Sequence, residues 1–285
     1  MSKATQLKAR LGESRIIVMP GAYNALVAKQ IEQAGFEGVY VSGAGLSNSW
    51  GVPDIGKLTL DDFVRAAQWV TRAVDVPVIS DADTGFSNIG YTVERYIKAG
   101  LAGMHIEDQV SPKRCGHLCG KEVIPYGEMV EKIKAAVRAR DRYDSDFLII
   151  ARTDARGATN VNEEQQFEET IQRGKIYLEA GSDMTFPESL RDEGEFRRYK
   201  EKVGGWLFAN MTEFGETPYI TWEKFEELGY HIVIFPVTLL RCHAGQTNVA
   251  LQVIKDEGNQ QNLVPQMITR DAINELLGYN PRSEG

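Results

Sequence analysis

The chain has 285 residues, of which 42% are hydrophobic and 25% charged, and its formal net charge is −8. This acidic balance, without a block rich in Lys or Arg, argues against nucleic acid as a partner, because phosphate binding depends on positive charge. No apolar run approaches the roughly 20 residues that span a bilayer, and the N-terminus lacks the pattern of a secretory signal. We therefore expect a cytoplasmic globular protein with no membrane partner.

Short β-branched runs that end in polar residues alternate with longer amphipathic segments, a pattern typical of strands that alternate with helices. In chain order, the expected strands are Ile16–Met19, Val39–Val41, Val78–Ser80, Gly103–Ile106, Phe147–Ala151, Met184–Phe186, Trp206–Ala209 and Ile232–Phe235. The expected helices are Asn24–Ala34, Leu60–Val74, Tyr91–Ala99, Glu128–Ala139, Glu163–Glu179, Trp222–Leu228 and Leu239–Ile254.

Eight strands are the number that closes a parallel barrel, and such barrels take about 250 residues. We therefore predict a single (β/α)₈ barrel domain of the TIM type over residues 1–285, with a C-terminal helical extension from about residue 239. An open, doubly wound sheet is the alternative. The lack of a Gly-x-Gly-x-x-Gly turn after the first strand argues against it.

Carboxylates follow the third and fourth expected strands where these end. Asp81 and Asp83 stand on one side of the third strand, and Glu107 follows the fourth. Carboxylates that meet with no cation between them repel one another unless a hard divalent ion is held there, so the sequence predicts a Mg²⁺ site that Mn²⁺ could also occupy. The alternative is an ordinary turn at Asp83-Thr84-Gly85, with Asp81 capping the next helix.

Other strand ends carry groups suited to anions. Ser42-Gly43-Ala44-Gly45 follows the second strand, and its small residues let backbone N–H groups approach a carboxylate, although a simple turn explains the segment equally well. Arg152, Arg241 and Arg270 each offer a two-pronged donor for a carboxylate; the alternative for each is a surface or salt-bridging role. These residues favour a small acidic ligand.

A glycine-punctuated polar loop, residues 113–121, follows the fourth strand and contains Cys115 between basic residues. Positive neighbours lower the pKa of a thiol, so Cys115 could act as an acid or base near neutral pH. Gly116 and Gly120 would allow the loop to move as a lid that excludes water. The alternative is a structural cysteine in a loop.

Eight segments recur together in one family: Tyr40-Val41-Ser42-Gly43, Val52-Pro53-Asp54, Asp81-Ala82-Asp83-Thr84-Gly85-Phe86, His105-Ile106-Glu107-Asp108-Gln109, Lys113-Arg114-Cys115-Gly116-His117, Ala151-Arg152-Thr153-Asp154, Phe186-Pro187-Glu188 and Ala209-Asn210-Met211-Thr212-Glu213-Phe214-Gly215. With them the chain resembles the isocitrate lyase/phosphoenolpyruvate mutase superfamily, and within it the short methylisocitrate lyases, from about Pro20 to Arg270. The segment with Cys115 marks the lyase branch.

The resemblance implies a role for each of these residues. Asp81 and Asp83 would hold the metal, supported by Asp54 and Glu107. The candidate catalytic groups are Cys115, Arg152, Tyr40 and His117. The candidate substrate-binding residues are Ser42, Gly43, Ala44, Gly116, Glu188, Asn210, Thr212, Arg241 and Arg270.

By the same resemblance, the expected reaction is a Mg²⁺-dependent retro-aldol cleavage of a 2-hydroxy polycarboxylate, first of all 2-methylisocitrate to pyruvate and succinate. The alternatives are a 2,3-dimethylmalate lyase giving pyruvate and propionate, an oxaloacetate hydrolase, and a non-catalytic barrel that binds dicarboxylates. Pro236 stands where the hydrolases usually have serine, which argues against hydrolysis. The family commonly forms homotetramers with exchanged C-terminal helices, and we expect the same arrangement in this chain.

Overall fold

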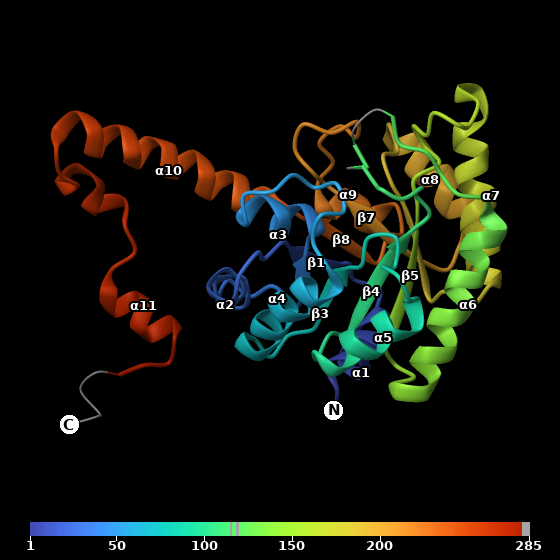
Figure 1. Cartoon of the computed structure of the whole chain (residues 1–285), viewed down its shortest axis with the longest axis horizontal. Coiled ribbons are helices and arrows are strands. Elements are labelled where there is room, and N and C mark those ends of the chain that lie inside the picture. Colours follow the sequence, from blue (N-terminus) through green and yellow to red (C-terminus); the bar gives the residue numbers. More distant parts are fainter. Residues whose placement is uncertain (115, 118–119, 281–285) are drawn as a thin grey trace.

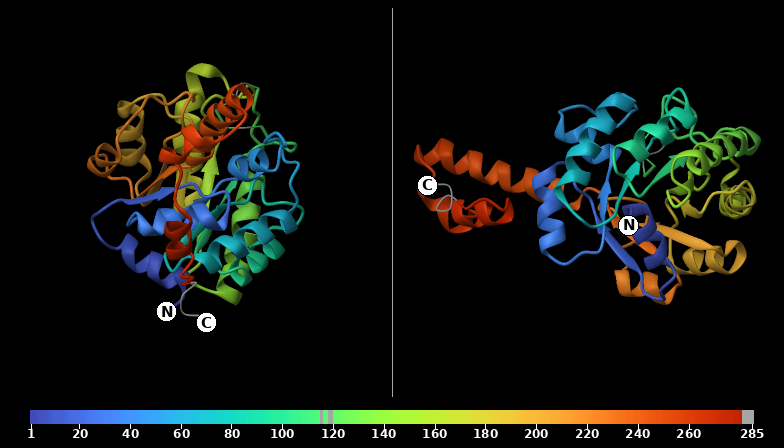
Figure 2. Two further views of the ribbon diagram at one scale, coloured as in Figure 1. Left: turned by 90° about the vertical axis from the view of Figure 1, so that its left-hand side faces the viewer. Right: turned by 90° about the horizontal axis from the view of Figure 1, so that it is seen from below.

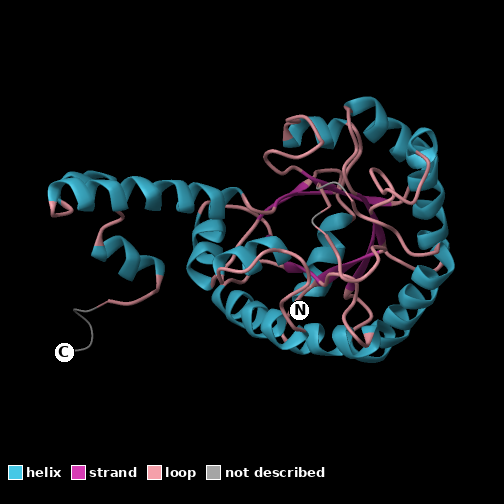
Figure 3. Cartoon of the chain, turned by 45° about the horizontal axis from the view of Figure 1, so that its top comes forward, coloured by secondary structure: helices cyan, strands magenta, loops and turns pink. Residues whose placement is uncertain are grey.

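Eight parallel strands form a nearly closed barrel in the computed structural model, which describes residues 1–114, 116–117 and 120–280. The strands are β1 (Ile17–Pro20), β2 (Val39–Val41), β3 (Val78–Asp81), β4 (Gly103–Glu107), β5 (Leu148–Thr153), β6 (Met184–Pro187), β7 (Trp206–Asn210) and β8 (Ile232–Phe235). Their order is β1-β8-β7-β6-β5-β4-β3-β2, and Figure 3 shows the ring that they make. β1 and β2 come together just beyond the end of β1, where Ala22 N donates to Tyr40 O at 2.8 Å. The barrel prediction is confirmed, and the doubly wound alternative is wrong.

Helices surround this ring (Figure 1). They are α1 (Lys3–Leu11), α2 (Ala25–Gln33), α3 (Gly43–Ser49), α4 (Leu60–Ala73), α5 (Ile89–Lys98), α6 (Tyr126–Tyr143), α7 (Gln166–Glu179), α8 (Glu193–Val203), α9 (Trp222–Glu227), α10 (Thr238–Glu257) and α11 (Arg270–Leu276), with 3₁₀ turns η1 (Glu163–Gln165) and η2 (Gln261–Gln266). Every expected strand and helix overlaps an observed one. No helix of the described part is long and apolar enough to cross a membrane.

Four helices were not expected from the sequence: α1, α3, α8 and α11. Helix α8 is rich in charge and buries only Glu195, Phe196 and Tyr199, so its apolar periodicity is weak. Helix α3 consists of small and polar residues with low helix propensity and begins at Ser42, whose side chain accepts from Gly45 N. The interpretation of Ser42–Gly45 as a simple turn is therefore wrong, because the segment is the start of a helix.

The two ends of the barrel differ. Helix α1 lies across the amino end of the strands, seen from below in Figure 2, and buries Leu7 and Leu11 there. The loops that follow the strands gather at the opposite end, near the top of Figure 1. The side chains at the carboxyl ends of the strands therefore lie at the end of the barrel that α1 does not cover.

Helix α10 leaves the barrel and continues into α11 as a projecting arm (Figures 1 and 2). None of its residues is buried. At its base, a largely apolar groove of about 730 Å³ lies against β1, β8, α2 and α9. This groove is lined by Val18, Pro20, Tyr23, Asn24, Leu26, Val27, Gln30, Ile31, Ala34, Phe36, Trp222, Phe235, Thr238, Leu239 and His243. Leu26, Phe36 and Trp222 of this groove are between 37% and 41% exposed, so the described part of the chain covers the groove only partly.

Candidate active site

A cavity of about 340 Å³ opens at the carboxyl ends of the strands. The predicted site residues that line it are Tyr40, Ser42, Ala44, Asp54, Asp81, Gly116, His117, Arg152, Glu188, Asn210, Thr212 and Arg241. Lys113, Phe186 and Phe214 also line it, although the sequence analysis assigned them no role there. Residues from strands far apart in the chain therefore share one space.

Five predicted residues are not part of this lining. Gly43, Asp83 and Glu107 are buried directly beside it. Cys115 lies outside the residues that the structure describes. Arg270 is exposed at the start of α11, on the projecting arm, and its own chain does not bring it to the cavity.

The acidic side of the cavity contains a lysine. Lys113 Nζ lies 2.6 Å from Asp83 Oδ1 and 2.8 Å from Asp54 Oδ1. Asp81 accepts hydrogen bonds from Asp83 N at 2.8 Å and Gly43 N at 3.2 Å. The premise that these carboxylates meet with no cation between them is therefore wrong. The basic residues of the loop were the signal available in the sequence, because a lysine that becomes buried pairs with carboxylates.

Burial and charge set the protonation of this corner. Burial raises the pKa of Asp83 to about 6 even though Lys113 opposes the shift. For Asp81, burial alone would raise the pKa, but the interaction with His105 and the positive charges of Lys113 and Arg152 outweigh it, so the pKa is lowered. Burial would lower the pKa of Lys113, but the surrounding carboxylates outweigh it and raise the pKa well above its ordinary value. Lys113 is therefore a permanent cation at neutral pH.

The same corner fits a divalent ion. A Cβ at Gly43 would lie 2.7 Å from Asp81 Oδ2 and 3.3 Å from Asp83 Oδ1, so both carboxylates converge on this backbone. Among the described residues, neither buried carboxyl oxygen of Glu107 has a hydrogen-bond partner. Within the described ranges, no group of three or more Asp, Glu, His or Cys is arranged to hold a metal. Mg²⁺ nevertheless commonly binds through one or two carboxylates and keeps several waters, so the pair Asp81 and Asp83 suits it.

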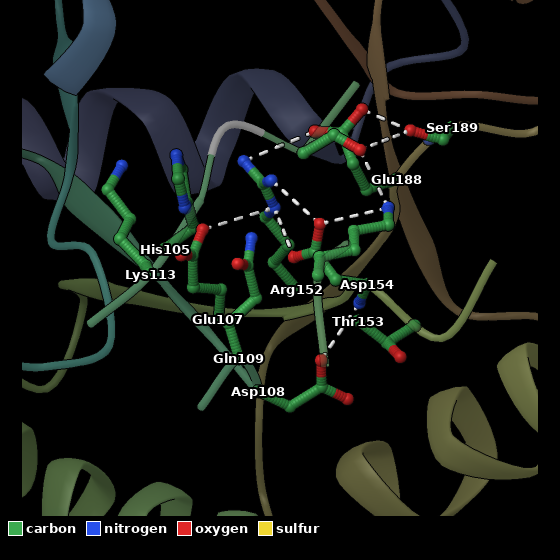
Figure 4. Close-up of polar contacts among 12 residues, drawn as sticks. His105, Glu107, Asp108, Gln109, Lys113, Arg152, Thr153, Asp154, Glu188 and Ser189 are labelled. Atoms are coloured by element: carbon green, nitrogen blue, oxygen red, sulfur yellow. Dashed lines mark hydrogen bonds and ion pairs between the residues drawn. The ribbon is translucent and has the colours of Figure 1, made fainter. Parts of the chain in front are cut away.

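Arg152 is held by three carboxylates (Figure 4). Its Nε and Nη2 donate to the two oxygens of Asp154 at 2.8 and 2.9 Å. Its Nη1 lies 3.2 Å from Glu188 Oε2, and its Nε lies 3.4 Å from Glu107 Oε2. The guanidinium carbon also stands 5.2 Å from the centre of the Phe186 ring. Asp154 therefore fixes the direction of Arg152, a role that the sequence analysis missed.

Two acids beside Arg152, Glu107 and Glu188, have pKa values that are shifted in different directions. Burial raises the pKa of Glu107 well above its ordinary value, although the nearby Arg152 and Lys113 oppose the shift. Burial acts on Glu188 in the same direction, but Arg152 and His117 outweigh it, and the pKa of Glu188 is lowered. The pKa values of these two neighbouring acids are therefore shifted in opposite directions.

His117 bridges the loop and the barrel. Its Nε2 lies 2.7 Å from Glu188 Oε1, and its Nδ1 accepts from Glu216 N at 3.1 Å. Because Nδ1 is an acceptor, the proton belongs on Nε2, which donates to Glu188. Asn210 Nδ2 donates to Glu188 Oε1 at 3.2 Å. These bonds hold His117 over the end of β6 and β7.

Tyr40 and His105 form a buried pair below the cavity. The Tyr40 hydroxyl lies 2.6 Å from His105 Nε2, and His105 Nδ1 lies 3.7 Å from Asp81 Oδ1. Burial lowers the pKa of His105 to about 4, so the ring is neutral near pH 7. Burial raises the pKa of Tyr40 well above its ordinary value. Tyr40 therefore keeps its proton at neutral pH and can act as a hydrogen-bond donor.

Arg241 lies at the mouth of the cavity and is already paired. Its Nη1 donates to Glu213 Oε2 at 2.7 Å and to Thr212 Oγ1 at 3.3 Å. Its guanidinium also stands 5.4 Å from the centre of the exposed Phe214 ring. A substrate carboxylate would have to share Arg241 with Glu213.

A barrel whose strand ends gather buried carboxylates, a lysine and an arginine around one small cavity defines an enzyme that acts on a small anionic ligand. The chain belongs to the isocitrate lyase/phosphoenolpyruvate mutase superfamily, since the phosphoenolpyruvate phosphomutase family model matches residues 7–254. The resemblance found in the sequence is confirmed.

Three proteins of known activity show which members of the superfamily the chain is similar to. The chain is 45% identical to a 2-methylisocitrate lyase from Aeropyrum pernix over 277 residues, which are 96% of this chain and 87% of the relative. Its fold is similar to a crystal structure of 2,3-dimethylmalate lyase, with a TM-score of 0.90 and 34% identity over 98% of this chain and 92% of the other. It is also similar to phosphonopyruvate hydrolase in complex with oxalate and Mg²⁺, with a TM-score of 0.84 and 30% identity over 98% and 95% of the two chains.

Proposed function

We propose that this chain is a Mg²⁺-dependent carbon–carbon lyase that cleaves 2-methylisocitrate to pyruvate and succinate. The observation that carries the proposal is the cavity of about 340 Å³ in which Asp81, Arg152 and Glu188 face one space, since its size and charge suit a small polycarboxylate. The similarity to the Aeropyrum pernix enzyme selects this reaction.

In this proposal Asp81 and Asp83 hold Mg²⁺, or Mn²⁺ as a substitute, and Asp54 and Glu107 support them. When bound, the ion stabilises negative charge on an oxygen of the keto acid that leaves. The phosphonopyruvate hydrolase complex with Mg²⁺ supports this assignment. Lys113 meanwhile supplies positive charge to Asp83 and Asp54 from the loop side.

The reaction is a retro-aldol cleavage. A general base takes the proton from the substrate hydroxyl, with Tyr40 contributing a hydrogen bond. The hydroxyl oxygen becomes the ketone oxygen of pyruvate as the carbon–carbon bond breaks. Arg152 faces this oxygen as its charge grows. The electron pair stays on the second fragment, and the Cys115 thiol delivers a proton there to give succinate. Gly116 and His117 stand beside that fragment and exclude water from it.

The remaining predicted residues bind the two ends of the substrate. We assign the carboxylate of the keto-acid end to Ser42, Gly43 and Ala44. We assign the second carboxylate to Glu188, Asn210, Thr212 and Arg241, with Glu188 acting through the hydrogen bond that it accepts from Asn210. Arg270 lies on the projecting arm, so it would reach a cavity only in another subunit.

We also propose a homotetramer in which C-terminal helices are exchanged between subunits. The barrel with its arm, from about residue 239, then remains one domain of 285 residues. The apolar groove beside β1 and β8 and the unburied α10 support this arrangement, because a second copy of α10 and α11 would cover the groove. Val249, Leu251 and Ile254 on α10 are between 47% and 59% exposed in the single chain.

A 2,3-dimethylmalate lyase is the second candidate. Within the described residues, neither arginine of the cavity is unpaired, because Arg152 meets Asp154 and Arg241 meets Glu213. A third substrate carboxylate would need an arginine of its own, so this pairing favours a dicarboxylate such as dimethylmalate. The fold similarity to 2,3-dimethylmalate lyase points in the same direction.

An assay with four substrates decides between the candidates. The purified protein with Mg²⁺ is given 2-methylisocitrate, 2,3-dimethylmalate, isocitrate or oxaloacetate, and pyruvate, glyoxylate and oxalate are measured. We expect pyruvate and succinate from 2-methylisocitrate, loss of turnover in EDTA and recovery with Mg²⁺. Pyruvate from dimethylmalate alone would establish the second candidate, and oxalate from oxaloacetate would indicate a hydrolase.

Two cysteine variants distinguish a lyase from a non-catalytic binding protein. Cys115→Ser should abolish turnover but leave pyruvate binding intact, because the thiol acts only after the bond breaks. Cys242→Ser is the matched control, since Cys242 is exposed on α10. Binding of all four acids with no turnover by the unmodified protein would indicate a non-catalytic barrel.

A further inference from the structure

Lys121 is a buried lysine whose ammonium lies between two parts of the site. Its exposed fraction is 2%. Its Nζ donates to Gly116 O at 2.7 Å and lies 3.2 Å from Asp154 Oδ1. Its backbone oxygen accepts from Thr159 N at 2.8 Å, and a Cβ at Gly157 would stand 3.3 Å from Lys121 Cε. A buried ammonium is stable only where its charge is matched, so this position is shaped for a cation.

Asp154 is the first group that Lys121 contacts. Both oxygens of Asp154 are committed to Arg152, and its backbone N donates to Asp108 Oδ1 at 2.8 Å. The lysine shares Oδ1 with Arg152 Nη2. The direction of the Asp154 carboxylate, and with it the direction of Arg152, therefore depends on both cations.

The Gly116 carbonyl is the second group. It accepts from Lys121 Nζ and also from Ser189 Oγ at 2.9 Å. Ser189 holds a φ of +61°, an uncommon conformation for a serine, immediately after Glu188. A Cβ at Gly116 would lie 2.1 Å from Arg152 Nη2. The Gly116 backbone is thus held against the guanidinium by two donors.

We propose that Lys121 is a positioning residue for Arg152: one ammonium group fixes both the carboxylate that directs Arg152 and the Gly116 backbone that packs on it. The proposal rests on the proposed function, because it takes Arg152 as the group that faces the reacting oxygen. Lys121 itself lies behind Arg152 and Gly116 and is not among the residues that line the cavity.

The test is the variant Lys121→Met, which keeps the length of the side chain and removes its charge. We expect kcat on 2-methylisocitrate to fall about 10- to 100-fold, the effect of one lost hydrogen bond to a charged group, with a smaller change in KM because Arg152 acts on charge that grows in the transition state. Lys121→Arg, which keeps the positive charge, should have a higher kcat than Lys121→Met. Lys3→Met is the control, since Lys3 donates to the carbonyl oxygens of Thr71 and Val74 at the other end of the barrel.

A double-mutant cycle with Asp154→Asn tests whether Lys121 acts on Arg152 through Asp154. If Lys121 acts partly through Asp154, Lys121→Met should cause a smaller loss of kcat in the Asp154→Asn background than in the unmodified protein, because only the contact with Gly116 O is then removed. Additive losses would overturn the proposal. So would a Lys121→Met enzyme with the turnover of the unmodified protein. Ser189→Ala is a milder second variant, and it should lower kcat in the same direction because it removes the other donor to Gly116 O.

A spectroscopic measurement keeps this result separate from the reaction assignment. The chain has four histidines, so the ¹³Cε1 NMR signal of His117, next to Gly116, can be identified with a His117 variant. We expect this signal to shift in Lys121→Met and to stay in place in Lys3→Met, with no substrate present. If the unmodified protein cleaves none of the four acids, the proposed function fails, whereas an unmoved His117 signal refutes the role of Lys121.

Discussion

Lys113 and Asp83 form a buried ion pair, with Nζ 2.6 Å from Oδ1, in the corner where the carboxylates suit a divalent ion. The exposed fraction of the lysine is 5%. The loop that follows β4 therefore supplies a cation to the same carboxylates that Mg²⁺ would bind. Lysine and metal ion share one set of negative charges, so the stability of the loop and the affinity for the metal should depend on each other.

Lys113→Met should destabilise the metal-free protein by roughly 3 kcal/mol, because it leaves a buried carboxylate without its partner. Urea unfolding in EDTA measures this loss, and saturating Mg²⁺ should recover part of it. Lys98→Met is the control, since Lys98 forms an exposed pair with Glu94 and its loss should leave the stability nearly unchanged. Equal stability of Lys113→Met and the unmodified protein in EDTA would show that the buried pair does not form in solution.

Mg²⁺ affinity should fall as the pH falls through about 6. Burial raises the pKa of Asp83 to about 6, so below that pH the carboxyl of the metal-free protein takes up a proton, and this proton must leave before the ion binds. Between pH 7.5 and 5.5 we expect a loss of affinity of about fourfold from this group alone. Titration calorimetry in buffers of different ionisation enthalpy measures both the affinity and the proton released. In Asp83→Asn binding should be weaker and this proton release absent; an unchanged release would assign the proton to another group.

Gly116→Ala should lower kcat by about 100-fold, because the new Cβ would lie 2.1 Å from Arg152 Nη2 and must displace the guanidinium. Gly127→Ala, in the first turn of α6, meets nothing within 4 Å and should leave kcat unchanged while stabilising the fold by about 0.5 kcal/mol. Steady-state kinetics and thermal unfolding of the two variants provide the comparison. If Gly116→Ala keeps full turnover, Arg152 does not occupy this position during the reaction.

Leu26→Asp should disrupt the homotetramer, because Leu26 is 40% exposed in the groove that a second copy of the arm would cover. Light scattering after size-exclusion chromatography should show a mass close to that of one chain, 31.8 kDa, for this variant. Trp69→Asp is the control, since Trp69 is 64% exposed on α4, away from the groove, and should keep the mass of the unmodified protein. A mass of 31.8 kDa for the unmodified protein would refute the exchange of helices.

The alternation of apolar runs along the chain was enough to predict the eight strands and the face on which they end. Asp81 and Arg152 could be found in this way because each stands at the end of an apolar run, where the strand order of a barrel leaves little choice. Helices α3 and α8 could not, since their residues are small or charged and show no clear periodicity. The sequence pattern reports which side of an element is buried, and these two bury little apolar surface.

Which charges neutralise one another was decided by the tertiary structure. Lys113 is far from Asp54 in the sequence, and Lys121 is far from Asp154, yet burial brings each pair within 3.2 Å. The direction of α10, which carries Arg270 away from its own cavity, is likewise absent from any local pattern. Helix and strand formation depend on neighbours along the chain, whereas ion pairing and packing depend on distances in space, which only the closed barrel fixes.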